Sequence, residues 1–249
     1  MNSYLLATVL VFAAWSGSSA EPPDLRAADA GTPPVIDGRL DDDAWRRAEW
    51  IELDTLRPEC PKSEAEWRIL EKNLGQTGYE RRQFSCKARA AVLHSPEGLY
   101  FAIEMEDMDV VGRMKDGETL WLEDVAEIFI APRPERGVPC LELQFSSANA
   151  TLFLKNGEKV FLPLRSAAAV DGTINDSLNT DRKWSVEVFL PWDMLEREKV
   201  ALRNSSTPCA VRFASWDLSL YSQLRLNRLS GPGGIDPHEC RDYRNIHLR

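Results

Sequence analysis

The sequence is poor in histidine and contains none of the common catalytic motifs. Its three histidines, His94, His238 and His247, are scattered along 249 residues. No G-x-S-x-G, P-loop, H-E-x-x-H or G-x-G-x-x-G pattern occurs, so the usual templates for hydrolases, NTPases, metalloproteases and dinucleotide enzymes find no support. A Ser-His-Asp triad has few histidines to draw on, and the absence of paired C-x-x-C units gives a zinc site little support.

Positive charge is also in deficit. Thirty Lys and Arg residues face 39 Asp and Glu residues, which gives a net charge of −9. Because polyanions attract basic surfaces, neither nucleic acid nor an anionic membrane surface is an expected partner. No stretch beyond the N-terminus is apolar enough to span a membrane. A chain of this length favours one large domain.

The N-terminus predicts export. Residues 1–20 carry no charged side chain, and residues 5–14 form an apolar run that is too short to cross a bilayer. Small residues precede position 21, as signal peptidase requires, so residues 1–20 are interpreted as a signal peptide and the protein as secreted or periplasmic. Proline and glycine are frequent in residues 21–32, which are interpreted as a linker before a domain over residues 33–249.

An exported chain can keep disulfides, since its compartment is oxidising. The simplest arrangement is two bonds and one remaining thiol, and a bridge from Cys60 to Cys86 is the first pairing to consider because the two bracket a polar segment. Buried free thiols are the alternative. The sequence has five cysteines: Cys60, Cys86, Cys140, Cys209 and Cys240.

Apolar and polar residues alternate with the period of a half-buried strand along much of the chain. The pattern is clearest over residues 99–106. Only residues 41–48 and 192–197 have short helical patterns. These features predict an all-β fold, an antiparallel β-sandwich of two sheets with one or two short helices. Similar strand patterns occur at residues 125–131, 141–146, 184–190 and 211–217.

Strand parity places a carboxylate among bulky apolar residues. Glu127 shares a face with Val125 and Phe129, and a buried charge requires a hydrogen-bonding partner. An ion pair with an arginine on the next strand is one explanation. The other is a ligand surface, because aromatic plates with nearby donors and acceptors suit the C–H faces and hydroxyls of a sugar. The Asp41–Asp43 run allows calcium binding or, as the alternative, a solvated acidic turn.

Five ordered blocks and a closing segment resemble family 9-like carbohydrate-binding modules. The closing segment is DYRNIHL at residues 242–248. The resemblance extends from Pro33 to the end of the chain. The five blocks are PPVIDGRLDDDAW (33–45), GLYFAIEMEDMDV (98–110), TLWLEDVAEIFIAP (119–132), LELQFSSANAT (141–151) and WSVEVFLPWDML (184–195).

The resemblance implies a sandwich of two antiparallel sheets, calcium held structurally in some members, and a sugar clamped between aromatic side chains. Trp121 matches the family's first stacking tryptophan, and Glu127 matches its hydroxyl-binding acid. The second stacking aromatic has no clear match, because the segment RLSGP at residues 228–232 offers Leu229 at that place.

The expected protein is therefore a secreted, non-catalytic carbohydrate-binding module, with a carbohydrate as its partner and structural calcium as its possible cofactor. It recognises a sugar end or a short glycan through Trp121 and Glu127. One alternative is an extracellular protein-interaction module that has lost sugar binding, and a less favoured one is a glycoside hydrolase with two carboxylates on a sheet face. Strand parity adds four further candidate contacts: Gln144, Asn149, Arg212 and Trp216.

Overall fold

A computed structural model describes residues 24–53, 55–58, 86–132, 140–218, 225–230, 238 and 243–249. Strands dominate these residues, as the alternating pattern predicts. The elements are β1 (Leu25–Asp29), η1 (Trp45–Arg47), β2 (Trp50–Glu52), β3 (Thr55–Pro58), β4 (Ala88–His94), β5 (Gly98–Glu106), η2 (Leu120–Leu122), β6 (Val125–Ala131), β7 (Leu141–Ser146), β8 (Thr151–Lys155), β9 (Glu158–Lys159), β10 (Arg165–Asp171), β11 (Lys183–Pro191), α3 (Trp192–Arg197), β12 (Ala210–Leu218), β13 (Arg225–Leu229) and β14 (Arg244–Leu248).

The strands predicted from alternation are confirmed. Residues 99–106 lie in β5, and the four other predicted segments coincide with β6, β7, β11 and β12 to within a residue at each end. In β5 the side chains of Leu99, Phe101, Ile103 and Met105 are all buried in the main core. The period of two therefore reports a real inner face, which is stabilised by removing these side chains from water.

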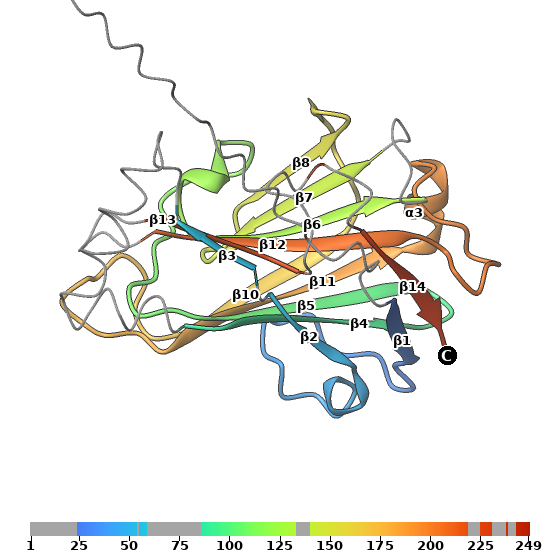
Figure 1. Ribbon diagram of the computed structural model, residues 1–249, viewed down its shortest axis with the longest axis horizontal. Coiled ribbons are helices and arrows are strands. Elements are labelled where there is room, and N and C mark those ends of the chain that lie inside the picture. Colours follow the sequence, from blue (N-terminus) through green and yellow to red (C-terminus); the bar gives the residue numbers. More distant parts are fainter. Residues whose placement is uncertain are drawn as a thin grey trace, which may run out of the picture.

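The strands form one curled sheet with the order β10-β11-β5-β4-β1-β14-β12-β6-β7-β8-β9. Figure 1 shows β6, β7 and β12 on one side of the core, with β4 and β5 on the other. Aromatic rings meet across this core, since the ring centroids of Phe101 in β5 and Phe213 in β12 lie 6.1 Å apart. The main core thus lies inside the curl of the sheet.

The prediction of a purely antiparallel fold is wrong, because β1 pairs in parallel with both β14 and β4. Residues 25–29, which the sequence analysis places in the linker, form this strand. Leu25 and Ala27 alternate with exposed residues and are buried in the main core. β1 bridges two strands that lie far apart in the sequence, and this makes the sheet continuous and mixed.

Of the two predicted helices, one is confirmed. Residues 192–197 form α3, whereas residues 41–48 contain only the short 3-10 helix η1. The acidic residues before η1 make other bonds: Asp42 Oδ2 accepts a hydrogen bond from the backbone N–H of Val35 at 2.9 Å, and Asp43 pairs with Arg46. Because the Asp42 carboxylate ties back the preceding loop and does not cap a helix, no full helical turn is stabilised there.

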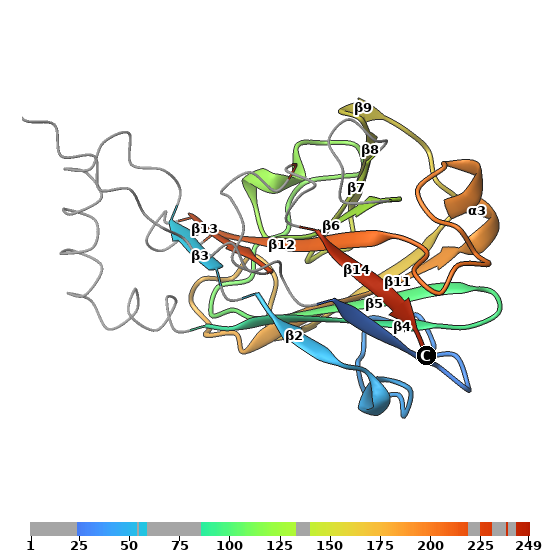
Figure 2. The ribbon, with the colours of Figure 1, turned by 45° about the vertical axis from the view of Figure 1, so that its right-hand side comes forward.

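Residues 30–49, here named the covering loop, pack against the outer face of β4, β5 and β11. Figures 1 and 2 show this loop and η1 beneath β4 and β5. A second apolar cluster holds it there, and within that cluster the Tyr100 and Phe189 ring centroids lie 4.8 Å apart. Trp45 is the largest buried contribution of the loop itself. The loop is thus part of the packed fold.

No disulfide joins the three cysteines that the structure describes, Cys86, Cys140 and Cys209. Burial raises the pKa of the Cys86 and Cys209 thiols to about 12, so both are protonated at neutral pH. Cys60 and Cys240, and with Cys60 the suggested Cys60–Cys86 pairing, lie outside the described residues. Among the described residues no helix has the length and apolarity needed to cross a membrane.

Candidate functional site

The outer face of β6, β7 and β12 brings several predicted site residues together. Glu127 in β6 lies opposite Gln144 in β7 and Ala214 in β12. Phe129, two residues further along β6, lies opposite Arg212. Arg212 is therefore the diagonal neighbour of Glu127, within the reach of long side chains across paired strands. Glu127, Gln144 and Arg212 thus share the outer face of the sheet, as the alternation along their strands predicts.

The sequence predicted an open, solvent-facing surface at these residues. The structure instead buries them. Glu127 is 2% exposed, and Gln144 and Arg212 are 0% exposed. Gln144 Nε2 donates a hydrogen bond to Glu142 Oε1 at 2.5 Å, and His238 Nε2 lies 3.0 Å from Glu142 Oε2. The face is a buried polar layer, in which charged groups require partners because water is excluded.

Trp121 is the solvent-accessible member of the group. It lies in η2, directly before β6, and is 40% exposed. The preceding residue, Leu120, is fully buried and packs with Val125 and Leu152. The half-buried Trp216 of β12 packs against the same cluster. η2 is thus anchored beside the start of β6 through Leu120, and Trp121 follows this anchor directly in the chain.

Two further positions differ from the expected arrangement. Asn149 lies in the turn after β7 with a positive φ of 61°, and its Nδ2 donates a hydrogen bond to the Ser166 carbonyl of β10 at 3.3 Å. The Asn149 side chain therefore contacts β10. Leu229 is fully buried beside Phe129 and Tyr243, so it supplies packing and offers no accessible stacking surface.

Three carboxylates converge in the interior at the same end of the sheet. Asp107 follows β5, Asp124 precedes β6 and Asp217 lies in β12. One oxygen from each lies within 4.8 Å of the others, and all three residues are buried. We name this group the acidic triad. Arg228 Nη1 lies 2.8 Å from Asp217 Oδ2, which places a positive charge beside the acidic triad.

The acidic triad is electrostatically costly when fully ionised. Burial and the nearby Asp217 raise the pKa of Asp107 to about 7, and burial with the charges of Asp107 and Asp217 raises the pKa of Asp124 well above its usual value. Asp124 accepts hydrogen bonds from the backbone N–H groups of Val111 and Leu218, at 2.5 and 2.6 Å. Asp107 Oδ2 is buried and has no hydrogen-bond partner among the described residues.

The donor set of the acidic triad fits a hard divalent cation, since calcium prefers carboxylate and carbonyl oxygens. A cation there would satisfy Asp107 Oδ2 and offset the repulsion between the carboxylates. From the sequence, the Asp41–Asp43 run was the calcium candidate, and the acidic triad was not predicted. The available signal was the acidic residues that directly flank apolar strands at positions 107 and 124.

Two solved structures with this fold are carbohydrate-binding modules of family 9 from Caldicellulosiruptor kristjanssonii. One, in complex with cellotriose, shares 12% identity at a TM-score of 0.57 and covers 90% of this chain and 93% of its own. The other, in complex with glucose, shares 15% identity at a TM-score of 0.58 and covers 90% and 95%. The sequence itself matches no protein-family profile and no curated protein. The chain has a family 9-like fold.

Proposed function

We propose that this protein is a secreted, non-catalytic carbohydrate-binding module that recognises a sugar end or a short glycan. The observation that carries the proposal is the accessible indole of Trp121, which η2 presents six residues before Glu127 on a fold shared with sugar-binding modules. A pyranose ring stacks its C–H face on such an indole, because both surfaces are apolar and flat.

Hydrogen bonds to the hydroxyls are the second part of the proposal. We assign them to Glu127, with Gln144, Asn149, Arg212 and Trp216 as further candidates. Gln144 lies directly opposite Glu127, and Arg212 lies diagonally from it. Because Glu127 is almost fully buried, a hydroxyl that reaches it would form its bond away from bulk water, where a charge-assisted hydrogen bond is strong.

Calorimetric titration of Trp121→Ala with cellotriose and glucose tests the stacking. We expect binding to fall below detection while the protein stays folded, since Trp121 is 40% exposed and belongs to none of the buried core clusters. Phe161→Ala is the matched control, because Phe161 is an aromatic side chain that is 90% exposed on the loop after β9. Unchanged affinity in Trp121→Ala would remove the proposed site, and unchanged affinity in Glu127→Gln would remove the acid from it.

The same fold also permits an extracellular protein-interaction module that has lost sugar binding. The burial of Leu229 favours this second candidate, because the side chain offers no second stacking plate. A glycan array without any bound sugar, with a folded protein and a defined binding partner, would support it. Steady release of reducing ends by the purified protein, abolished in Glu127→Gln, would instead establish a hydrolase.

We further propose that the acidic triad holds a structural calcium ion. Three buried carboxylates whose oxygens lie within 4.8 Å of one another repel when ionised, and a dication among them would offset this repulsion. A ligand that binds only the folded state raises stability, by about 2.7 kcal/mol at a hundredfold excess over its dissociation constant.

Melting temperature with calcium and with a chelator is the direct measurement. We expect calcium to raise the melting temperature of the natural sequence and not of Asp107→Asn. Asp41→Asn is the control for an exposed acid outside the triad. Equal stabilisation of all three proteins would place the ion elsewhere.

Export is proposed from residues 1–20 of the sequence. Expression of the full chain followed by N-terminal sequencing of the exported product tests it. The expected new terminus is Glu21.

A further inference from the structure

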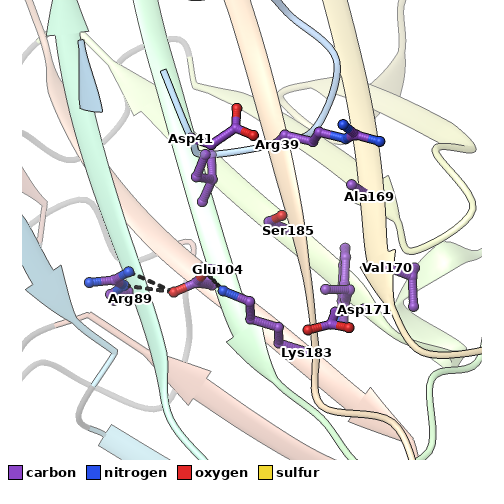
Figure 3. A pocket seen from close by; sticks show the side chains of 11 residues that line it. Arg39, Asp41, Arg89, Glu104, Ala169, Val170, Asp171, Lys183 and Ser185 are labelled. Atoms are coloured by element: carbon purple, nitrogen blue, oxygen red, sulfur yellow. Dashed lines mark hydrogen bonds and ion pairs between the residues drawn. The ribbon is translucent and has the colours of Figure 1, made fainter. Parts of the chain in front are cut away.

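A polar cavity of about 400 Å³ lies on the outer face of β5, β10 and β11, beside residues 39–41 of the covering loop. Figure 3 shows its charged side chains around a common space. Arg39 and Asp41 come from the covering loop, Glu104 from β5, and Asp171 and Lys183 from β10 and β11. This volume is within the range of small-molecule sites in proteins.

The lower wall of the cavity carries one surplus positive charge. Glu104 Oε1 accepts a hydrogen bond from Arg89 Nε at 2.9 Å, and Glu104 Oε2 accepts one from Lys183 Nζ at 2.6 Å. Burial alone would raise the pKa of Glu104, but the hydrogen bonds and charges of Lys183 and Arg89 outweigh it and hold the pKa below its usual value. One carboxylate therefore faces two cations, and Asp171 is bonded separately to Arg182.

The upper wall adds a separate donor and a separate acceptor. The side chains of Arg39 and Asp41 are exposed and make no hydrogen bond or ion pair with other described residues. In Figure 3 the two lie across the cavity from Glu104 and Lys183. The cavity thus has one surplus positive charge, on its lower wall, and a neutral pair of one cation and one carboxylate on its upper wall.

The covering loop is fixed at this place by buried bonds. Glu187 Oε2 accepts hydrogen bonds from the backbone N–H groups of Asp37 and Gly38, at 3.0 and 2.9 Å, and its Oε1 accepts one from Trp45 Nε1 at 2.6 Å. Ser185 Oγ donates to the Gly38 carbonyl at 2.7 Å. Arg39 follows this anchored turn directly, so the wall of the cavity is positioned before any ligand arrives, which lowers the cost of binding.

We infer that this cavity is a second ligand site, separate from Trp121, and that it binds an acidic sugar such as a uronic acid. The sugar carboxylate would bind between Arg39 and Lys183, and its hydroxyls would donate to Asp41 and Asp171. Arginine and lysine suit a carboxylate through charge-assisted hydrogen bonds, and aspartate suits hydroxyl donors.

A neutral sugar fits this cavity less well than an acidic one. The side chains drawn in the cavity offer no aromatic plate for stacking, because Trp184 lines it while its own side chain is buried in the main core. A ligand with hydroxyls alone would leave the surplus positive charge without a partner. A carboxylate without hydroxyls would leave Asp41 without a donor, since only Asp171 is already bonded, to Arg182. A ligand that carries both a carboxylate and hydroxyls matches the charged side chains of the cavity.

Calorimetric titration of the full chain with D-glucuronate tests the inference, with D-glucose and acetate as probes that each lack one of the two groups. We expect glucuronate to bind the natural protein and to bind Arg39→Gln and Lys183→Gln about tenfold more weakly or worse. Arg26→Gln is the matched control, because Arg26 is an exposed arginine on β1 that does not line the cavity. Both cavity variants should fold, since Arg39 is exposed and Glu104 keeps Arg89 when Lys183 is changed.

Trp121→Ala separates this site from the proposed stacking site. Glucuronate affinity that survives Trp121→Ala and falls in both cavity variants supports the inference, whatever glucose or cellotriose does at Trp121. The inference is overturned if glucuronate does not bind, if its affinity is the same in both cavity variants as in Arg26→Gln, or if glucose or acetate binds Trp121→Ala as tightly as glucuronate does.

Discussion

The bond between Trp45 and Glu187 should make the stability of this protein depend on pH in a defined direction. Trp45 Nε1 donates to Glu187 Oε1 at 2.6 Å, and Glu187 is fully buried. Trp45→Phe keeps an aromatic ring in the apolar cluster and removes the donor. Burial raises the pKa of Glu187 from 4.5 to about 7, against the effect of the three hydrogen bonds that its carboxylate accepts.

The direction of the pH dependence follows from the protonation of the Glu187 carboxyl group. A carboxyl group with a raised pKa in the folded state contributes stability below pH 4.5 and loses it as pH rises through 7. Losing a donor raises the folded-state pKa of Glu187 further, so Trp45→Phe is penalised more at high pH. A hydrogen bond to a charged group contributes about 1.5–3 kcal/mol and a neutral one about 0.5–1.5 kcal/mol. We therefore expect the destabilisation to grow by roughly 1–2 kcal/mol between pH 5 and pH 8.

Urea denaturation followed by far-ultraviolet circular dichroism at both pH values measures this difference. The side-chain volume lost in Trp45→Phe lowers the free energy of unfolding equally at pH 5 and pH 8. Only the lost hydrogen bond therefore contributes to the difference between the two pH values. Trp50→Phe is the matched control, because Trp50 Nε1 donates to a neutral group, the Trp45 carbonyl, at 3.3 Å. A destabilisation of Trp45→Phe that is equal at pH 5 and pH 8 would refute the reasoning.

Two other changes test the packing, and a third tests the acidic triad. Gly38→Ala should destabilise the protein by about 2 kcal/mol or more, measured by urea denaturation, because an added Cβ would lie 2.5 Å from the Ala168 backbone and φ is +85°. Phe213→Ala should cost about 3–5 kcal/mol by the same assay, since its ring is fully buried in the main core. Asp124→Asn should abolish the rise in melting temperature on adding calcium, while Asp41→Asn should retain it.

The strands were predictable from the sequence because the side chains on one face of each strand are apolar and buried, whereas those on the other face are less apolar. In β6, Ala126, Ile128 and Ile130 face the main core, as their spacing requires. The same parity correctly put Glu127 on the other face. Parity gives the face of a side chain but not what covers it, and this is why the burial of Glu127 and Arg212 could not be read from the pattern.

Features that depend on distant partners were not predictable in the same way. β1 is short, lies among prolines and glycines, and is stabilised by pairing Leu25 with Ile246 near the other end of the chain. The acidic triad assembles from three segments that no local spacing connects: Asp107, Asp124 and Asp217. Tertiary pairing thus decides both features, whereas local propensity decides the strands.

The Trp121 indole and the acidic triad are physically connected through the chain between them. Trp121 lies in a segment without strand pairing, and carboxylates fix that segment at both ends. Asp124 accepts hydrogen bonds from the backbone of Val111 and of Leu218 in β12, and Glu123 accepts one from the backbone of Arg113 at 2.6 Å. These bonds are strongest when the carboxylates are ionised, and ionisation is what burial opposes. A cation at the acidic triad would favour the ionised carboxylates. It would thereby stabilise the segment that carries Trp121, the proposed stacking residue.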